Sequence, residues 1–133
     1  MSINIRVIAP DRTVFDTQVE EVILPSSTGQ LGILKNHAPL LSALDIGVMR
    51  VKIDGKSVPV YLNGGFAEID NNQLIVLVNS AEKGSNIDQN VAQQDLEVAT
   101  VMVNQAVTNK EKLDATQAIR KAKARLQAAT FTN

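Results

Sequence analysis

The hydrophobic pattern of this chain changes its period once, and that change divides the chain into two parts. Up to about residue 80, apolar and polar residues alternate in short runs such as "INIRV" and "VMRVKI", as in strands with one buried face. From Asp88 to Asn109 there is neither proline nor glycine, and apolar residues recur every three or four positions, which is the helical period. The segment "AEKGSN" between the two parts has the composition of a linker.

Residues 1–85 are predicted to form a flattened β-sandwich or barrel. The strand-like runs are separated by turn signals at Pro10-Asp11, Asp54-Gly55, Gly64-Gly65 and Asp70-Asn71-Asn72. Many short strands at such spacing are typical of these all-β folds. The run "QLIVLVN" is apolar without alternation, so we expect its strand to be buried on both faces.

Residues 86–133 are predicted to form an antiparallel hairpin of two helices, which makes the fold class α+β, mostly β. The expected apolar stripes are Ala92, Leu96, Ala99, Val103 and Ala106, then Ala115, Ile119, Ala122, Leu126 and Ala129. Thr108 and Glu111 have the spacing of a capping box that begins the second helix. Each alanine in place of leucine forgoes roughly 2 kcal/mol of burial, so the hairpin should be weakly held. It is either a plain appendage or a helical pair that can detach and bind another surface.

Composition and charge exclude several classes of protein. The absence of cysteine removes disulfides, thiolate metal sites and cysteine nucleophiles. No apolar run approaches the ~18 residues of a membrane span, and the first residues have neither signal-peptide nor transit-peptide character. We therefore expect a soluble chain that either is made where it works or has been separated from a leader. A net charge of −1 excludes strong global attraction to nucleic acid or anionic lipid.

The charges are unevenly distributed along the chain. Residues 1–97 carry seven basic and twelve acidic side chains, whereas residues 110–133 carry six basic and two acidic ones. The basic side chains Arg120, Lys121, Lys123 and Arg125 lie mostly off the alanine stripe and should project outward. The C-terminal helix is therefore a candidate for meeting an acidic protein partner, although a solvated helix face has the same pattern.

The residues offer little support for catalysis. His37 is the only histidine, and no G-x-S-x-G elbow surrounds any serine. One histidine and no cysteine leave no set of metal ligands beyond carboxylates, and no calcium-loop pattern is present. The "DGKS" stretch lacks the first glycine of a phosphate-binding loop and is predicted to be a hairpin turn. We predict no catalytic residue, no metal and no cofactor.

Several stretches resemble the epsilon subunit of the proton-translocating ATP synthase, in its cyanobacterial and chloroplast branch. They are "VIAPDRTVFD", "EEVILPSSTGQLGILKNHAPLLSALDIGVMRV", "NGGFAEI", "LVNSAEKGSNID" and "IRKAKARLQAA", and together they cover nearly the whole chain. The resemblance implies a flattened β-sandwich followed by a helical hairpin. It also implies a non-catalytic rotor subunit of the central stalk, which couples proton flow through the c ring to ATP synthesis and inhibits hydrolysis through its C-terminal helices.

The resemblance assigns partners to particular residues. The c-ring contact falls on Ser27, Thr28, Gly29, Gln30 and Gly32, and the gamma interface on His37, Ala38, Pro39 and Leu40. An acidic segment of the beta subunits, with alpha nearby in the extended state, is expected to meet Arg120, Lys121, Lys123 and Arg125. The implied location is the stromal or cytoplasmic side of the thylakoid membrane, where the chain would be held only through the complex.

The same resemblance raises the question of ATP binding by the hairpin. Some bacterial relatives use an Ile-Asp-x-x-Arg-Ala motif, which in this chain reads Ile87, Asp88 and Ala92 with Val91 at the arginine position. The apolar side chain of valine cannot replace the planar, charged guanidinium of arginine, so we expect no physiological ATP binding. Three hypotheses follow: a coupling and inhibitory subunit, a ligand-sensing module with the hairpin as a nucleotide clamp, and a hydrolase centred on His37.

Overall fold

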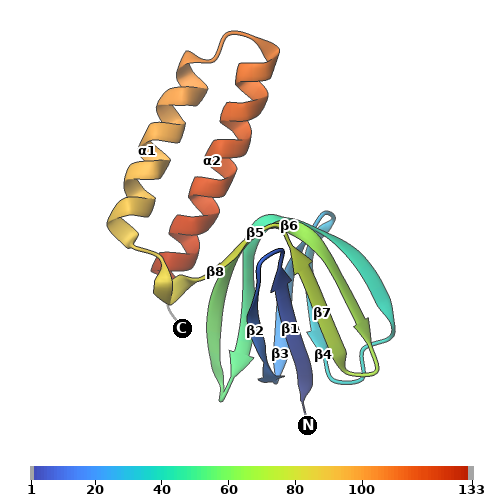
Figure 1. The fold of residues 1–133 in the computed structure, drawn as a ribbon. Helices are drawn as coiled ribbons and strands as arrows, with labels where there is room; N and C mark the ends of the chain where they lie inside the picture. The colour runs from blue at the N-terminus through green and yellow to red at the C-terminus, as the bar shows by residue number, and fades with distance from the viewer. Residues whose placement is uncertain (1, 132–133) are drawn as a thin grey trace.

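A computed structural model describes residues 2–131, which form a β-sandwich with a helical hairpin attached to it (Figure 1). The strands are β1 (Ile3–Ala9), β2 (Arg12–Val19), β3 (Glu21–Ser26), β4 (Gly29–Leu34), β5 (Leu40–Ile53), β6 (Lys56–Asp70), β7 (Gln73–Val78) and β8 (Ala81–Lys83). A short 3-10 turn, η1 (Gly84–Asn86), leads to α1 (Gln89–Gln105) and α2 (Asn109–Thr130). The fold class predicted from the sequence, a β-sandwich followed by two helices, is confirmed.

The two longest strands build both layers of the sandwich. The strand order is β2-β1-β7-β6-β5-β3-β4, with β8 paired to β6. The second half of β6 pairs with β7 and its first half pairs with β8, so β6 passes from one layer to the other. The two halves meet at Gly64-Gly65, where φ is 71° and 146°. A side chain on Gly65 would place its Cβ 2.0 Å from the carbonyl oxygen of Leu77, so only glycine fits there.

The turn predicted at Gly64-Gly65 is therefore wrong, because these glycines bend a continuous strand instead of ending it. The turns predicted at the other three positions are confirmed. At Asp54, Asn71 and Asn72 the backbone φ is positive, which asparagine and aspartate tolerate better than most residues.

The core between the layers is aliphatic and includes fully buried side chains such as Ile5, Leu24 and Met49. The prediction that the β7 strand is buried on both faces is wrong. Its burial alternates, and Ile75 and Leu77 remain 37% and 51% exposed. No layer within the described residues 2–131 covers that outer face.

The hairpin is held together mainly by alanines. The buried helical residues are Ala92, Ala99, Ala115, Ala122, Ala124 and Ala128. The predicted capping box is present, since Thr108 accepts a hydrogen bond from the backbone of Glu111, whose side chain accepts one from the Thr108 backbone. Val103, expected in the stripe, is 39% exposed, because the far half of α1 has only α2 as a neighbour.

The C-terminal end of α2 attaches the hairpin to the sandwich, while the two helices project away from it (Figure 1). A small cluster of Tyr61, Ile87, Ala92, Ala124 and Ala128 is buried at the junction. Contact is close: a Cβ on Gly84 would lie 2.2 Å from the Ala128 carbonyl oxygen. Apart from Tyr61 and Ile87 the fully buried members are alanines, and Ile46, Val48 and Leu126 pack against them while only partly buried.

Candidate interaction surfaces

The β3–β4 turn presents the residues predicted to contact a c ring. Ser27 and Thr28 form the turn, and Gly29, Gln30 and Gly32 begin β4; all five are exposed. The turn is fixed locally, because the Thr28 backbone N–H donates to Ser26 Oγ at 3.2 Å. No atom lies within 4 Å of where a Cβ would stand on Gly29 or Gly32. These residues therefore form one accessible surface that a neighbouring protein can approach closely.

The loop between β4 and β5 carries the residues predicted for a gamma interface. His37 is half-buried, and Ala38, Pro39 and Leu40 are exposed. The loop is shaped by a bond from the His37 backbone N–H to the Leu34 carbonyl (3.1 Å). His37 Nδ1 lies 2.6 Å from the Ala38 carbonyl oxygen and donates to it. The imidazole is thus engaged with its own loop, and among residues 2–131 it forms no hydrogen bond to the serine and carboxylate that a hydrolytic triad requires.

A shallow hollow of about 610 Å³ lies beside this loop. It is lined by Asn36, His37, Ala38, Pro39 and the β6–β7 turn residues Asp70, Asn71 and Asn72. The loop and the turn are joined by two hydrogen bonds between Asn36 and Asn72, which are 36 residues apart in sequence: one from the Asn36 backbone N–H and one from the Asn72 side chain. The resulting surface is polar at the hollow and becomes apolar where β5 begins at Leu40.

An exposed apolar surface lies next to that loop on the outer side of the sandwich. Its members are Leu41, Phe66, Ile75 and Leu77, which are 66%, 56%, 37% and 51% exposed, and we call this set the outer apolar face. Phe66 is paired with Leu77, and Glu68 lies between Leu41 and Ile75, so all four side chains point the same way.

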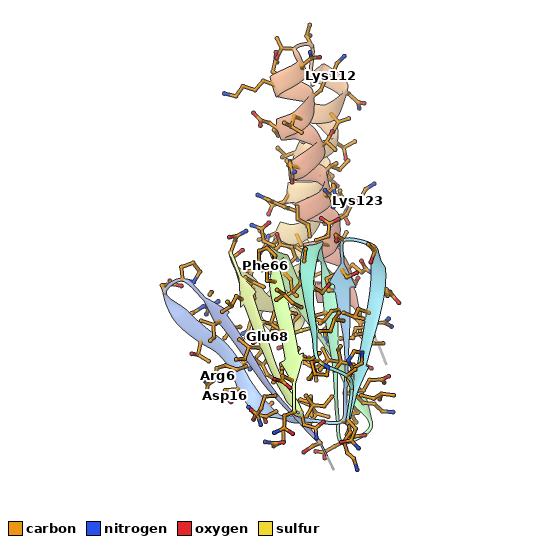
Figure 2. All side chains as sticks on the ribbon, turned by 90° about the vertical axis from the view of Figure 1, so that its right-hand side faces the viewer. Arg6, Asp16, Phe66, Glu68, Lys112 and Lys123 are labelled. Carbon is orange, nitrogen blue, oxygen red and sulfur yellow. The ribbon has the colours of Figure 1, made fainter. Side chains whose placement is uncertain are left out.

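Charged side chains border the outer apolar face. Arg6 lies opposite Ile75 in the strand register and pairs with Asp16 at 3.5 Å. Figure 2 shows Phe66, Glu68, Arg6 and Asp16 along this side of the molecule. Clustered exposed apolar side chains with a polar rim mark protein-binding surfaces. Sequence reasoning missed this face, although the unalternating apolar run of β7 was its signal.

Of the four basic residues of α2 predicted to meet a beta subunit, two contact the sandwich. Arg125 donates from Nε and Nη2 to the two carboxylate oxygens of Glu82 at 2.8 and 3.1 Å, and from Nη1 to Asp95 of α1 at 3.1 Å. Arg120 pairs with Asp45 of β5. Lys121 and Lys123 are exposed, and neither forms an ion pair among residues 2–131. The expectation that all four project outward therefore holds for the two lysines only.

These ion pairs change the proton affinity of the groups at the junction. The hydrogen bond from Arg120, together with the Ile46 backbone N–H, lowers the pKa of Asp45. The hydrogen bonds to Glu82 raise the pKa of Arg125. Burial at the junction raises the pKa of Tyr61, helped by the negative charge of Glu82. Each shift favours the protonation state that the group already has at neutral pH.

The residues that match an ATP-binding motif have structural roles in this fold. Ile87 is buried beside Tyr61, and Ala92 is fully buried at the junction. Asp88 is the N-cap of α1, where its carboxylate accepts from the backbone N–H groups of Asn90 and Val91 at 2.9 and 3.1 Å. Val91 itself is 46% exposed. Packing and helix capping are sufficient to explain these residue types.

Residues 2–131 contain neither a cluster of three side chains suited to a metal ion nor a helix with the length and apolarity needed to cross a membrane.

The comparisons with known proteins agree with the fold and the sequence pattern. Residues 2–84 match the family model "ATP synthase, Delta/Epsilon chain, beta-sandwich domain". The chain is 66% identical over 128 residues to the chloroplastic ATP synthase epsilon chain of Guillardia theta, covering 96% of this chain and 98% of the relative. It is 54% identical over 132 residues to the ATP synthase epsilon chain of Thermosynechococcus vestitus, covering 97% and 96%.

A solved structure has the same fold. A chain of the Euglena gracilis mitochondrial ATP synthase, in a complex of OSCP, F1 and c-ring, superposes with a TM-score of 0.84 at 20% identity, covering 98% of this chain and 82% of that one. The identities to chloroplast and cyanobacterial relatives extend through both the sandwich and the hairpin. The chain belongs to the family of ATP synthase epsilon chains, structural and regulatory subunits that are not themselves catalytic.

Proposed function

We propose that this chain works in the central stalk of a proton-translocating ATP synthase, between the gamma subunit and the c ring. In that position the sandwich transmits rotation, and the hairpin inhibits ATP hydrolysis when it leaves the sandwich and reaches the catalytic head. The proposal rests on family membership together with three separate surfaces, each suited to a different neighbour.

The gamma subunit is proposed to cover the outer apolar face and the adjoining loop of His37 to Leu40. Four large apolar side chains are exposed there, and leaving them in water forgoes about 25 cal/mol per Å². A permanent partner that covers these side chains is the simplest explanation for a sheet face so rich in large apolar residues. The expected effect of His37→Ala is weaker gamma association, and unchanged assembly and coupling would oppose this role.

The c ring is proposed to meet the β3–β4 turn. A contact with the polar loops of a rotating ring needs an exposed and well-shaped turn without a bulky apolar group. Ser27, Thr28 and Gln30 supply hydroxyl and amide groups, and the two glycines leave their surroundings open. Charge is not required of this turn, since polar hydrogen bonds suffice to fix a register.

The single observation that supports the inhibitory role is that basic residues of α2 bind the sandwich through ion pairs. Arg120 and Arg125 hold the hairpin by pairing with Asp45 and Glu82, across a junction whose fully buried residues are mostly alanines. An acidic segment of the beta subunits, with alpha beside it, offers the same chemistry to these arginines and to the exposed Lys121 and Lys123. The hairpin can then exchange one set of carboxylates for another.

The complex is proposed to lie on the thylakoid membrane, on the stromal or cytoplasmic side, and this chain to be associated with the membrane only through its partners. The relatives named as chloroplastic and the cyanobacterial relative support that location. A nucleotide clamp is the second candidate, and Val91 in place of a motif arginine opposes it. Titration calorimetry of the isolated chain with ATP should give no binding heat at physiological concentrations.

The deciding experiment measures ATPase activity of the assembled catalytic head with no epsilon chain, with the full chain, and with a chain lacking residues 88–133. The full chain should lower hydrolysis, and the truncated chain should bind the head without lowering it. Equal hydrolysis with both chains would refute the inhibitory role, and failure of both to bind would refute the stalk position.

A further inference from the structure

We infer that Asn36 and Asn72 act as a clasp that holds the loop of His37 to Leu40 in the shape needed to bind its partner. This inference rests on the proposed gamma interface and assigns positioning residues to it. The Asn36 backbone N–H donates to Asn72 Oδ1 at 2.6 Å, and Asn72 Nδ2 donates to Asn36 Oδ1 at 3.3 Å. Neither side chain is part of the apolar contact itself.

The clasp joins two segments just beyond the end of the β5–β6 ladder, whose last pair is Leu40 with Ile69. Asn36 lies in the β4–β5 loop and Asn72 in the β6–β7 turn, and both have positive φ, 64° and 63°. Asparagine tolerates this left-handed conformation, and its short amide can still reach a neighbouring segment. The chain therefore has asparagines at two strained positions whose side chains face each other, where glycine would satisfy the backbone alone.

The β6–β7 turn is itself anchored to the sandwich. The Asn72 carbonyl accepts from the backbone N–H of Asn4 at 2.9 Å, and the turn follows directly on β6 and leads into β7. The clasp therefore connects the loop to a rigid support. A loop that is already in its bound shape loses less conformational entropy on association.

The clasp makes a specific kinetic prediction. If only a fraction of the free chains has the loop in the competent shape, the apparent affinity falls by that fraction. A positioning defect therefore slows association with gamma, whereas a lost contact speeds dissociation. We expect loss of the clasp to slow association about tenfold and to leave the dissociation rate within about twofold of the original.

The test measures binding kinetics of the full chain to its cognate gamma subunit for three variants. Asn72→Gly removes both clasp bonds and keeps the positive φ. Asn71→Gly is the matched control, because Asn71 has a φ of 52° in the same turn and forms no side-chain hydrogen bond within residues 2–131. Asn36→Asp keeps the backbone donor and an acceptor oxygen for Asn72, so its association rate should stay near that of the original chain.

The outcomes separate the inference from the proposed function. Slow association in Asn72→Gly alone, with a melting temperature close to that of the Asn71→Gly control, supports the clasp. An unchanged association rate, a purely faster dissociation, or an equal defect in Asn71→Gly overturns it while the gamma interface stands. If the original chain does not bind gamma at all, the proposed interface is refuted and the clasp role is refuted with it.

Discussion

Replacement of Arg125 by glutamine should shift the hairpin from the docked to the undocked state. The guanidinium forms a two-pronged bond with Glu82 of the sandwich and a single bond with Asp95 of α1. Only the Glu82 bond is lost when the hairpin leaves the sandwich, because Asp95 travels with it. The relevant side chains are 25% and 35% exposed, so the pair lies between a surface and a buried ion pair.

The size of the effect follows from that intermediate burial. Exposed pairs contribute about 0–1 kcal/mol and hydrogen bonds to charged groups about 1.5–3 kcal/mol. We take about 2 kcal/mol for this pair, which raises the ratio of undocked to docked chains roughly thirtyfold. Since the fully buried residues of the remaining junction are mostly alanines, such a change should be visible in the isolated chain.

The assay measures a distance between two spin labels on introduced cysteines. The protein has no cysteine of its own. Val107→Cys between the helices and Lys56→Cys at the start of β6 therefore give two label sites without competing thiols. Arg125→Gln should add a population at longer distances, and Glu82→Gln should do the same. The double variant should resemble either single one, because both remove the same bond.

The matched control is Lys123→Gln, which removes an equal charge from an exposed position on the same helix (Figure 2). It should leave the distances unchanged. An equal shift in this control would mean that total charge, and not the bond to Glu82, governs docking. Unchanged distances in Arg125→Gln would refute the role of the ion pair.

Three further predictions concern pH, the gamma interface and the first helix. Arg120 lowers the pKa of Asp45 in the docked state. The contribution of Asp45 to docking is therefore complete above about pH 4, the ordinary pKa of an aspartate, and is lost as the pH falls through the lowered pKa. The distance between the two labels should lengthen in acid, and should lengthen less in Asp45→Asn. Phe66→Ser should weaken gamma binding roughly fiftyfold, because about half of a ~200 Å² side chain is available for burial, with little change in the melting temperature of the isolated chain. Asp88→Ala should destabilise α1 by about 1 kcal/mol through loss of its cap, which hydrogen exchange of the Asn90 and Val91 amides would report.

Features that depend on neighbouring residues in the sequence were predicted well. The capping box of Thr108 and Glu111 is a pattern of four residues, and it is present as expected. The change of hydrophobic period located the helices within a few residues. The first helix ends at Gln105, one residue before Ala106, the last member of its expected stripe, because nothing in the composition of that segment marks its end.

Features that depend on distant segments were not predicted from the sequence. Whether Gly64-Gly65 turns the chain or bends a strand is decided by the pairing of Gly65 with Leu44 of β5 and Val78 of β7. The bond between Arg125 and Glu82 joins residues 43 positions apart, and a charge count along the chain cannot give that pairing. The apolar run of β7 was visible in the sequence, but which of its faces packs on the core is set by the strands around it, and Ile75 and Leu77 on the other face stay exposed within residues 2–131.

The ion pairs of Arg120 and Arg125 do not by themselves determine whether the hairpin is docked or extended. In the proposed exchange, Arg120 and Arg125 leave the carboxylates of Asp45 and Glu82 and meet carboxylates of the beta subunits, so bonds of similar strength are lost and gained. Salt weakens both sets, and its net effect on the balance should be smaller than its effect on either state. The ion pairs then define where the hairpin docks, while the apolar contacts decide which state is populated. The exposed apolar side chains of α1, among them Val98 at 61% and Val101 at 51%, are the surface from which the extended state can gain burial that the docked state lacks.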